Sequence, residues 1–138
     1  DLQAFLGMRQ LQKLDQVVDK RNRNYAYFNK HIKTNFWKPK QPDADNERFV
    51  SNMGYPIIHP KRNVIVGLCK EHAIEVRPLI SGTMGKQPFY RNMLGKTVAL
   101  RNADFVDQYG MYIPNHACLT DVEMETMCNI INKITGYE

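Results

Sequence analysis

Residues 110–135, GMYIPNHACLTDVEMETMCNIINKIT, contain a strand, a turn and a helix in the most clearly marked form of the whole chain. The apolar run from Gly110 to Pro114 predicts a strand. Thr120 and Glu123 have the T-x-x-E spacing of a capping box, in which each side chain accepts a hydrogen bond from a backbone N–H at the helix start. Apolar residues then recur at helical spacing and predict the buried face of a terminal helix: Met124, Met127, Ile131 and Ile134.

The segments upstream of this unit alternate between strand and helix patterns. Strands are predicted at 49–58 and 74–79, and helices at 61–72 and 101–109. A polar, proline-bearing loop covers 38–47. The order of elements predicts a mixed α/β (α+β) fold, in which helices pack on a small three-stranded sheet.

An apolar stripe near the N-terminus predicts one long helix over residues 2–33, which would be about 45 Å long at 1.5 Å per residue. The stripe includes Leu2, Phe5, Met8, Leu11, Leu14, Val18, Tyr25, Phe28 and Ile32. A helix of that length overhangs a domain of 138 residues. Its first half therefore needs a partner, which is either a second subunit or another domain.

The composition is typical of a soluble globular protein with one domain, since 43% of the residues are hydrophobic and 24% are charged. No apolar run approaches the roughly 18 residues that cross a bilayer, and no signal-peptide pattern opens the chain. The three cysteines, Cys69, Cys118 and Cys128, have no C-x-x-C spacing, and His116 with Cys118 lacks the further ligands of a metal site. We expect a cytoplasmic protein with buried free thiols at Cys69 and Cys128, no metal and no membrane contact.

Much of the net charge of +5 lies between Lys20 and Lys40, where basic residues are interleaved with aromatic ones. Such a mixture can hold nucleic acid through phosphate contacts and stacking. Tyr25, Phe28 and Ile32 continue the helical stripe, however, so these side chains are expected in a core. Nucleic-acid binding stays the less favoured reading.

Residues Arg77 to Arg91, RPLISGTMGKQPFYR, combine glycines with many anion and hydroxyl binders and lack helical periodicity. Two interpretations are open. The segment is either an ordinary surface connection or a loop whose glycines let the backbone approach a ligand. His116, which follows a strand and Pro114, is either a structural turn residue or a side chain that reaches a cleft. The chain has no P-loop, G-x-S-x-G, G-x-G-x-x-G or H-E-x-x-H motif and no evident pair of catalytic carboxylates.

Three segments, in order, resemble the C-terminal part of the DegT/DnrJ/StrS family of pyridoxal-phosphate enzymes, which act on nucleotide-linked keto sugars. These segments are DLQAFLGMRQLQKLDQVVDKR (1–21), IEVRPLISGTMGKQPFY (74–90) and YIPNHACLTDVEM (112–124). The second resembles the family's substrate-facing loop that ends in Q-P-x-Y, and the third its turn into the last helix. Together they span nearly the whole chain.

The resemblance implies that residues 1–138 are the small C-terminal domain of an aspartate-aminotransferase-like fold, with a linking helix over 1–34 and an α/β domain over 49–138. It implies a homodimeric parent enzyme in lipopolysaccharide or deoxyaminosugar biosynthesis, with pyridoxal phosphate and the Schiff-base lysine held by a preceding large domain. By the same resemblance, no catalytic residue or cofactor is expected in this chain, and the chain alone is expected to be inactive.

Carried over by position, the resemblance implies a set of substrate-binding residues, with Arg77 contacting a phosphate or the sugar. The set is Arg77, Ser81, Gly82, Gln87, Tyr90 and His116. Gly85 departs from the family's aminotransferases, many of which carry a sugar-facing histidine there. That departure leaves two reactions open, transamination and 3-dehydration of a keto-deoxysugar. From another class, a stand-alone module that binds an anion or nucleic acid remains an alternative.

Overall fold

The computed structural model describes residues 2–40, 51–79 and 82–135. Three strands form one antiparallel sheet in the order β1-β3-β2, so the predicted three-stranded α/β fold is confirmed. The elements are α1 (Leu2–Leu11), α2 (Leu14–His31), β1 (Gly54–Ile58), α3 (Arg62–Glu71), β2 (Arg77–Pro78), the short 3-10 helix η1 (Met84–Lys86), α4 (Pro88–Leu94), α5 (Arg101–Tyr109), β3 (Gly110–Pro114) and α6 (Asp121–Thr135).

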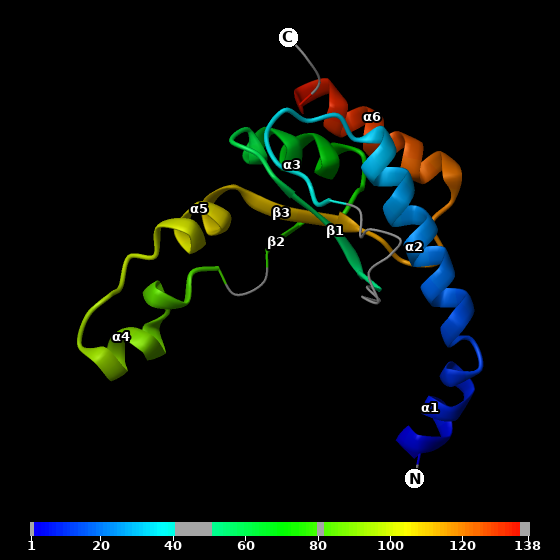
Figure 1. The fold of residues 1–138 in the computed structure, drawn as a ribbon, viewed down its shortest axis with the longest axis horizontal. Helices are drawn as coiled ribbons and strands as arrows, with labels where there is room; N and C mark the ends of the chain where they lie inside the picture. Colours follow the sequence, from blue (N-terminus) through cyan, green and yellow to red (C-terminus); the bar gives the residue numbers. More distant parts are fainter. Residues whose placement is uncertain (1, 41–50, 80–81, 136–138) are drawn as a thin grey trace.

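The core lies between one face of the sheet and the helices α2, α3 and α6 (Figure 1). Tyr55 pairs with Ile113 and Ile57 pairs with Met111, and all four side chains are fully buried. Alternate residues of a strand point to opposite faces, so Tyr112, which lies between two of these buried residues, points to the other face. The core therefore leaves one face of the sheet free of this helical layer.

The capping box at the start of α6 is confirmed. The backbone N–H of Thr120 donates to Glu123 Oε2 at 2.8 Å, and the backbone N–H of Glu123 donates to Thr120 Oγ1 at 3.2 Å. Met124, Met127 and Ile131 are buried, and Ile134 packs against the same core cluster. The apolar spacing alone therefore located the buried face of this helix correctly.

The prediction of one helix over 2–33 is wrong, because the chain breaks between α1 and α2. At the break, the N–H of Lys13 donates to the carbonyl of Gln10 at 3.0 Å, which is a tight turn. Leu11 and Leu14 on either side are 66% and 50% exposed. Most helix stability in proteins comes from packing of an apolar face, and at Leu11 and Leu14 that face is exposed, so little packing stabilises an unbroken helix there.

The prediction that residues 77–91 lack helix is also wrong in part. The segment contains η1 and the beginning of α4, which has Pro88 at its first turn and ends at Gly95 in the left-handed conformation. All seven residues of α4 are described and none is buried, so the helix packs no side chain into the core.

The remaining strand predictions are longer than the observed strands. The predicted strand 74–79 pairs only through Arg77 and Pro78, which lie opposite Tyr112 and Met111. The predicted strand 49–58 begins at Gly54, and positions 49 and 50 lie outside the described residues. Within the described ranges, no helix combines the length and apolar character needed to span a bilayer.

Candidate functional site

Arg77 lies on the edge strand β2, on the face of the sheet that carries Tyr112. Residues directly opposite one another in an antiparallel pair share a face, and Arg77 is opposite Tyr112. Its Nε donates to Glu75 Oε1 at 2.7 Å, and Nη2 lies 2.6 Å from the same oxygen. This hydrogen bond, together with the negative charge of Glu75, raises the pKa of the Arg77 guanidinium.

The free face of the sheet is hollowed beside Tyr112. A shallow cavity of about 400 Å³ is lined there by Asn52, Met53, Gly54, Pro56, Leu79 and Tyr112. Its lining is mostly apolar, with the Asn52 amide among the polar groups. Because Arg77 pairs with Tyr112, its guanidinium lies on the side of the sheet to which this cavity opens.

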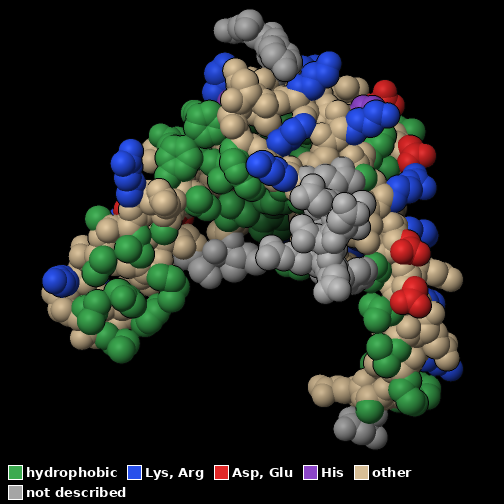
Figure 2. Space-filling view, in the orientation of Figure 1, with side chains coloured by type: hydrophobic (Ala, Val, Ile, Leu, Met, Phe, Trp, Pro, Cys, Tyr) green, Lys and Arg blue, Asp and Glu red, His purple; other side chains and the backbone are tan. Residues whose placement is uncertain are grey.

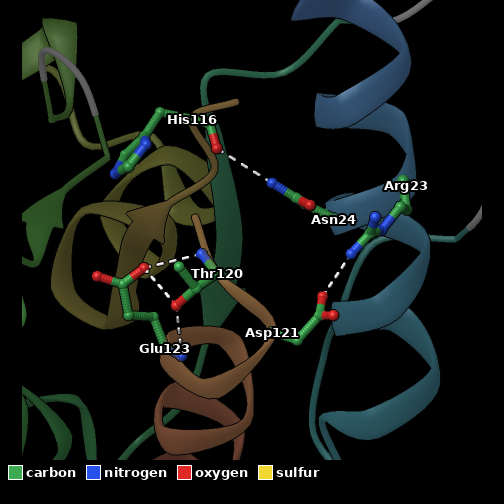
Figure 3. A network of polar contacts seen from close by, with 6 residues as sticks. All are labelled: Arg23, Asn24, His116, Thr120, Asp121 and Glu123. Carbon is green, nitrogen blue, oxygen red and sulfur yellow. Dashed lines mark hydrogen bonds and ion pairs between the residues drawn. The ribbon is translucent and has the colours of Figure 1, made fainter. Parts of the chain in front are cut away.

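His116 lies in the turn between β3 and α6, and α2 holds its backbone in place (Figure 3). Asn24 Nδ2 donates to the His116 carbonyl at 3.0 Å, while Arg23 pairs with Asp121 on the first turn of α6. The imidazole is exposed, and its Nδ1 accepts a hydrogen bond from the N–H of Cys118 at 3.3 Å. In the neutral ring, the proton is therefore on Nε2, which is a donor.

A cavity of about 540 Å³ adjoins His116, and the segment that follows α3 forms its opposite wall. Its floor is apolar and its rim carries His72, Glu75, His116 and Glu123; the other lining residues are Ala73, Ile74, Pro114, Leu119, Val122, Thr126 and Met127. The Thr120 backbone N–H and hydroxyl bind Glu123, and these bonds lower the pKa of its carboxyl. Glu75 lines this cavity together with His116, and Glu75 also binds Arg77, which is not among the lining residues.

The other predicted site residues lie on a separate arm formed by η1, α4 and α5, which projects from the far end of β2 (Figure 1). Gln87 joins η1 to α4, with its N–H donating to the Met84 carbonyl at 3.1 Å. Tyr90 is half-buried on α4, with its ring 6.1 Å from that of Phe89. Ser81 lies outside the described residues.

Two glycines of this arm, Gly82 and Gly85, face protein rather than open space. Gly82 has φ +55°, and a Cβ built on it would lie 2.5 Å from Asp107 Oδ1. A Cβ on Gly85 would lie 2.1 Å from the carbonyl oxygen of Val98, whose own N–H donates to the Gly85 carbonyl at 2.9 Å. One of the two interpretations left open by the sequence was that these glycines let the backbone approach a ligand. In the structure, they allow η1 and the residues beside it to pack closely on α5 and on Val98. Val98 lies in residues 96–100, the segment between α4 and α5 that we call the strap.

Two of the predicted site residues thus adjoin Glu75: Arg77 binds it, and His116 lines a cavity that Glu75 also lines. Gly82, Gln87 and Tyr90 lie on the arm. The sequence reasoning missed Glu75. A signal was available, because Glu75 is two residues before Arg77 in a predicted strand and therefore shares its face. Nothing comparable in the sequence marked the cavity wall at His72, which follows the end of α3.

Solved structures with the same architecture include a sugar dehydratase with bound pyridoxal phosphate and an aminotransferase. The chain superimposes on Escherichia coli GDP-4-keto-6-deoxy-D-mannose-3-dehydratase with bound hydrated pyridoxal phosphate, with a TM-score of 0.74, 23% identity, and coverage of 91% of this chain and 33% of the other. For the Helicobacter pylori aminotransferase PseC, which is involved in pseudoaminic acid biosynthesis, the TM-score is 0.77 at 20% identity, with coverage of 94% and 36%. At these identities, the likeness establishes the fold.

A family model identifies the chain more closely. The model of the DegT/DnrJ/EryC1/StrS aminotransferase family matches residues 1–132, and the chain belongs to that family. Among curated proteins, it is 24% identical to the lipopolysaccharide biosynthesis protein RfbH of Salmonella typhimurium, over 99% of this chain and 32% of that protein. The chain spans about a third of the length of the relatives that it matches.

Proposed function

We propose that the chain is the C-terminal small domain of a homodimeric, pyridoxal-phosphate-dependent enzyme that acts on nucleotide-linked keto sugars, with aminotransferase activity in the full-length protein. The observation that carries this proposal is the family match over residues 1–132, combined with coverage of only a third of each relative. In this proposal, residues 1–34 link the small domain to a larger one, and residues 49–138 form the small domain itself.

Two exposed apolar surfaces support a larger partner domain. All ten residues of α1 are described and none is buried; Leu2 is 73% exposed. On the arm, Met93 of α4 is 78% exposed. Figure 1 shows α1 and α4 projecting from the sheet on the side opposite α3 and α6, and apolar side chains gather over both in Figure 2. Contiguous apolar surface of this kind is typical of an interface.

The described lysine contacts support a cofactor site outside this chain. The lysines with described contacts are engaged: Lys38 donates to the carbonyls of Asn29 and Ile32 at 2.7 and 2.9 Å, and Lys86 lies 3.0 Å from Asp104. Among the described residues that line the two cavities at the sheet, there is no lysine. The proposal therefore assigns the Schiff-base lysine and the cofactor contacts to the larger domain.

The proposed contribution of this chain is substrate binding. Arg77 is well suited to a phosphate, because its planar guanidinium is exposed on an edge strand and can donate two parallel hydrogen bonds. The proposed contacts remain Arg77, Ser81, Gly82, Gln87, Tyr90 and His116. His116 lies on a cavity away from the arm. A domain closure or a long ligand therefore has to connect His116 with the residues of the arm.

The test is a comparison of the full-length protein with the isolated chain. We expect the full-length protein to bind pyridoxal phosphate, as read from its absorbance, and to convert a nucleotide-linked keto sugar with glutamate as amino donor. We expect Arg77→Ala to weaken nucleotide-sugar binding while leaving cofactor absorbance unchanged. A full-length protein that takes up no cofactor, or a 138-residue chain that binds it stably by itself, would contradict the proposal.

Dehydration at C3 is the second candidate, and Gly85 is the observation that favours it. The backbone of Val98 occupies the space where a side chain at position 85 would begin, so the loop cannot present the histidine that many aminotransferases of the family carry there. Product analysis separates the two reactions. An amino sugar indicates transamination, whereas a 3-deoxy keto sugar with release of ammonium indicates dehydration.

A stand-alone nucleic-acid module is the alternative from another class. Its basic and aromatic segment loses much of its support in the structure, because Phe28 and Ile32 are fully buried and Tyr25 packs edge-on against Tyr55 with centroids 5.2 Å apart. Titration of the isolated chain with single-stranded oligonucleotide decides this. Measurable binding at low salt that falls steeply with ionic strength would favour the module.

A further inference from the structure

The ion pair between Glu75 and Arg77 leaves part of the guanidinium available. Glu75 uses one oxygen, Oε1, to accept from both Nε and Nη2, which together form one edge of the guanidinium fork. Arginine carries five N–H donors in a fixed plane, so Nη1 and the far edge can still bind a second anion. The carboxylate therefore lies beside the phosphate position assigned to Arg77 without occupying it.

The pair contributes little to the fold. The side chains of Arg77 and Glu75 are 64% and 67% exposed, and ion pairs so accessible to water add little to stability. A role in binding accounts for the arrangement better. A carboxylate is an acceptor without a proton to donate, so it repels a bare phosphate but accepts hydrogen bonds from hydroxyl groups.

We propose that Glu75 determines specificity: it accepts a hydrogen bond from a sugar hydroxyl adjacent to the phosphate that Arg77 binds. This inference rests on the proposed function, and it specifies that this edge of the sheet binds the sugar hydroxyl beside the phosphate. The guanidinium on β2 and the carboxylate two residues before it, which bind each other, match a ligand that carries an anion next to hydroxyl donors. Nucleoside diphosphate sugars have that chemistry, and inorganic pyrophosphate has the anion alone.

The surroundings of Glu75 provide room for a polar ring. Glu75 lines the 540 Å³ cavity together with His116, whose Nε2–H can donate to a ring or hydroxyl oxygen. The apolar floor, which includes Ile74 and Leu119, suits the carbon face of a sugar. The phosphate would then lie toward Arg77 and the hydroxyl groups toward the cavity.

The test measures two affinities on the same full-length protein by calorimetry, with GDP-mannose and inorganic pyrophosphate as probes. We expect Glu75→Ala to lower the affinity for GDP-mannose about tenfold, which corresponds to the loss of one charge-assisted hydrogen bond. Pyrophosphate should bind equally well or about threefold more tightly, because a like charge is removed. Glu71→Ala, on the exposed end of α3, is the matched control and should change neither affinity.

The ratio of the two affinities separates the possible failures. Equal weakening of both probes would show that Glu75 merely orients Arg77, and unchanged affinities would show that it has no role; either result overturns the inference. Glu75→Asp should restore part of the preference for GDP-mannose, and its failure to do so also counts against a hydroxyl contact. If the folded wild-type protein binds pyrophosphate but neither GDP-mannose nor a uridine or thymidine diphosphate sugar, the proposed function itself fails.

Discussion

Substitution of Gly85 by alanine tests whether the arm depends on close backbone packing. The added Cβ would lie 2.1 Å from the Val98 carbonyl oxygen, whereas real Cβ contacts are essentially never shorter than 3.0 Å. The two segments therefore have to separate by about 0.9 Å, which is the difference between 2.1 and 3.0 Å. The obstacle is a backbone carbonyl, so no side-chain rotation can relieve it.

The expected cost has two parts. Overpacking that forces a backbone shift costs about 1–3 kcal/mol. Separation also weakens the 2.9 Å hydrogen bond from the Val98 N–H to the Gly85 carbonyl, which adds about 1 kcal/mol. We expect Gly85→Ala to destabilise the arm by about 2–4 kcal/mol in total. If the arm detaches before the core unfolds, its own docking free energy sets the upper limit of the effect.

Hydrogen exchange of the Val98 amide measures the local opening of the arm. Urea denaturation followed by circular dichroism measures the unfolding free energy of the whole chain. Gly67→Ala is the matched control, because Gly67 lies inside α3 with nothing within 4 Å of its built Cβ. That variant should be stabilised by about 0.5–1 kcal/mol, since alanine is the better helix former. Val98 exchange in Gly85→Ala at the wild-type rate, with stability within about 0.5 kcal/mol, would refute the packing account.

Three further predictions concern the α6 cap, the α3 terminus and the thiols. Thr120→Ala should cost about 1 kcal/mol of unfolding free energy; since Thr120 lowers the pKa of Glu123, the stability difference between wild type and Glu123→Gln should be present at pH 6 and disappear as pH falls through the folded pKa of Glu123. Ala73→Gly should stabilise by about 1 kcal/mol in thermal melts, because Ala73 has φ +56°. Cys118 should react with a disulfide reagent at pH 8, while the buried thiols react after unfolding, since burial raises the pKa of Cys128 to about 12.

Local sequence signals predicted the elements whose stability is local or that face the core. The T-x-x-E cap and the stripe of α6 needed no information from elsewhere in the chain. The break between α1 and α2 was missed because it depends on what the stripe contacts, and around Leu11 and Leu14 the stripe is exposed. The short helix α4 was missed for a related reason, since it packs no apolar face on the core.

The candidate site could be predicted only as a set of residue types. Arg77 and His116 were predicted from a resemblance, but their separation from Gln87 and Tyr90 depends on where β2 ends and the arm begins. Pairing with β3 determines that point, and it covers two residues of a strand that the pattern extended over six. Strand pairing is set between segments distant in sequence, so no local pattern could have predicted it.

Gly85 and the backbone around Val98 constrain each other. A histidine is absent at this position, but the backbone at Val98 fills the space and donates a hydrogen bond to the glycine itself. The glycine and the strap around Val98 are therefore one structural feature, and neither can change without the other. Gly85→His alone should disrupt the arm rather than introduce a sugar-facing imidazole. A side chain at residue 85 would require the backbone around Val98 to move as well.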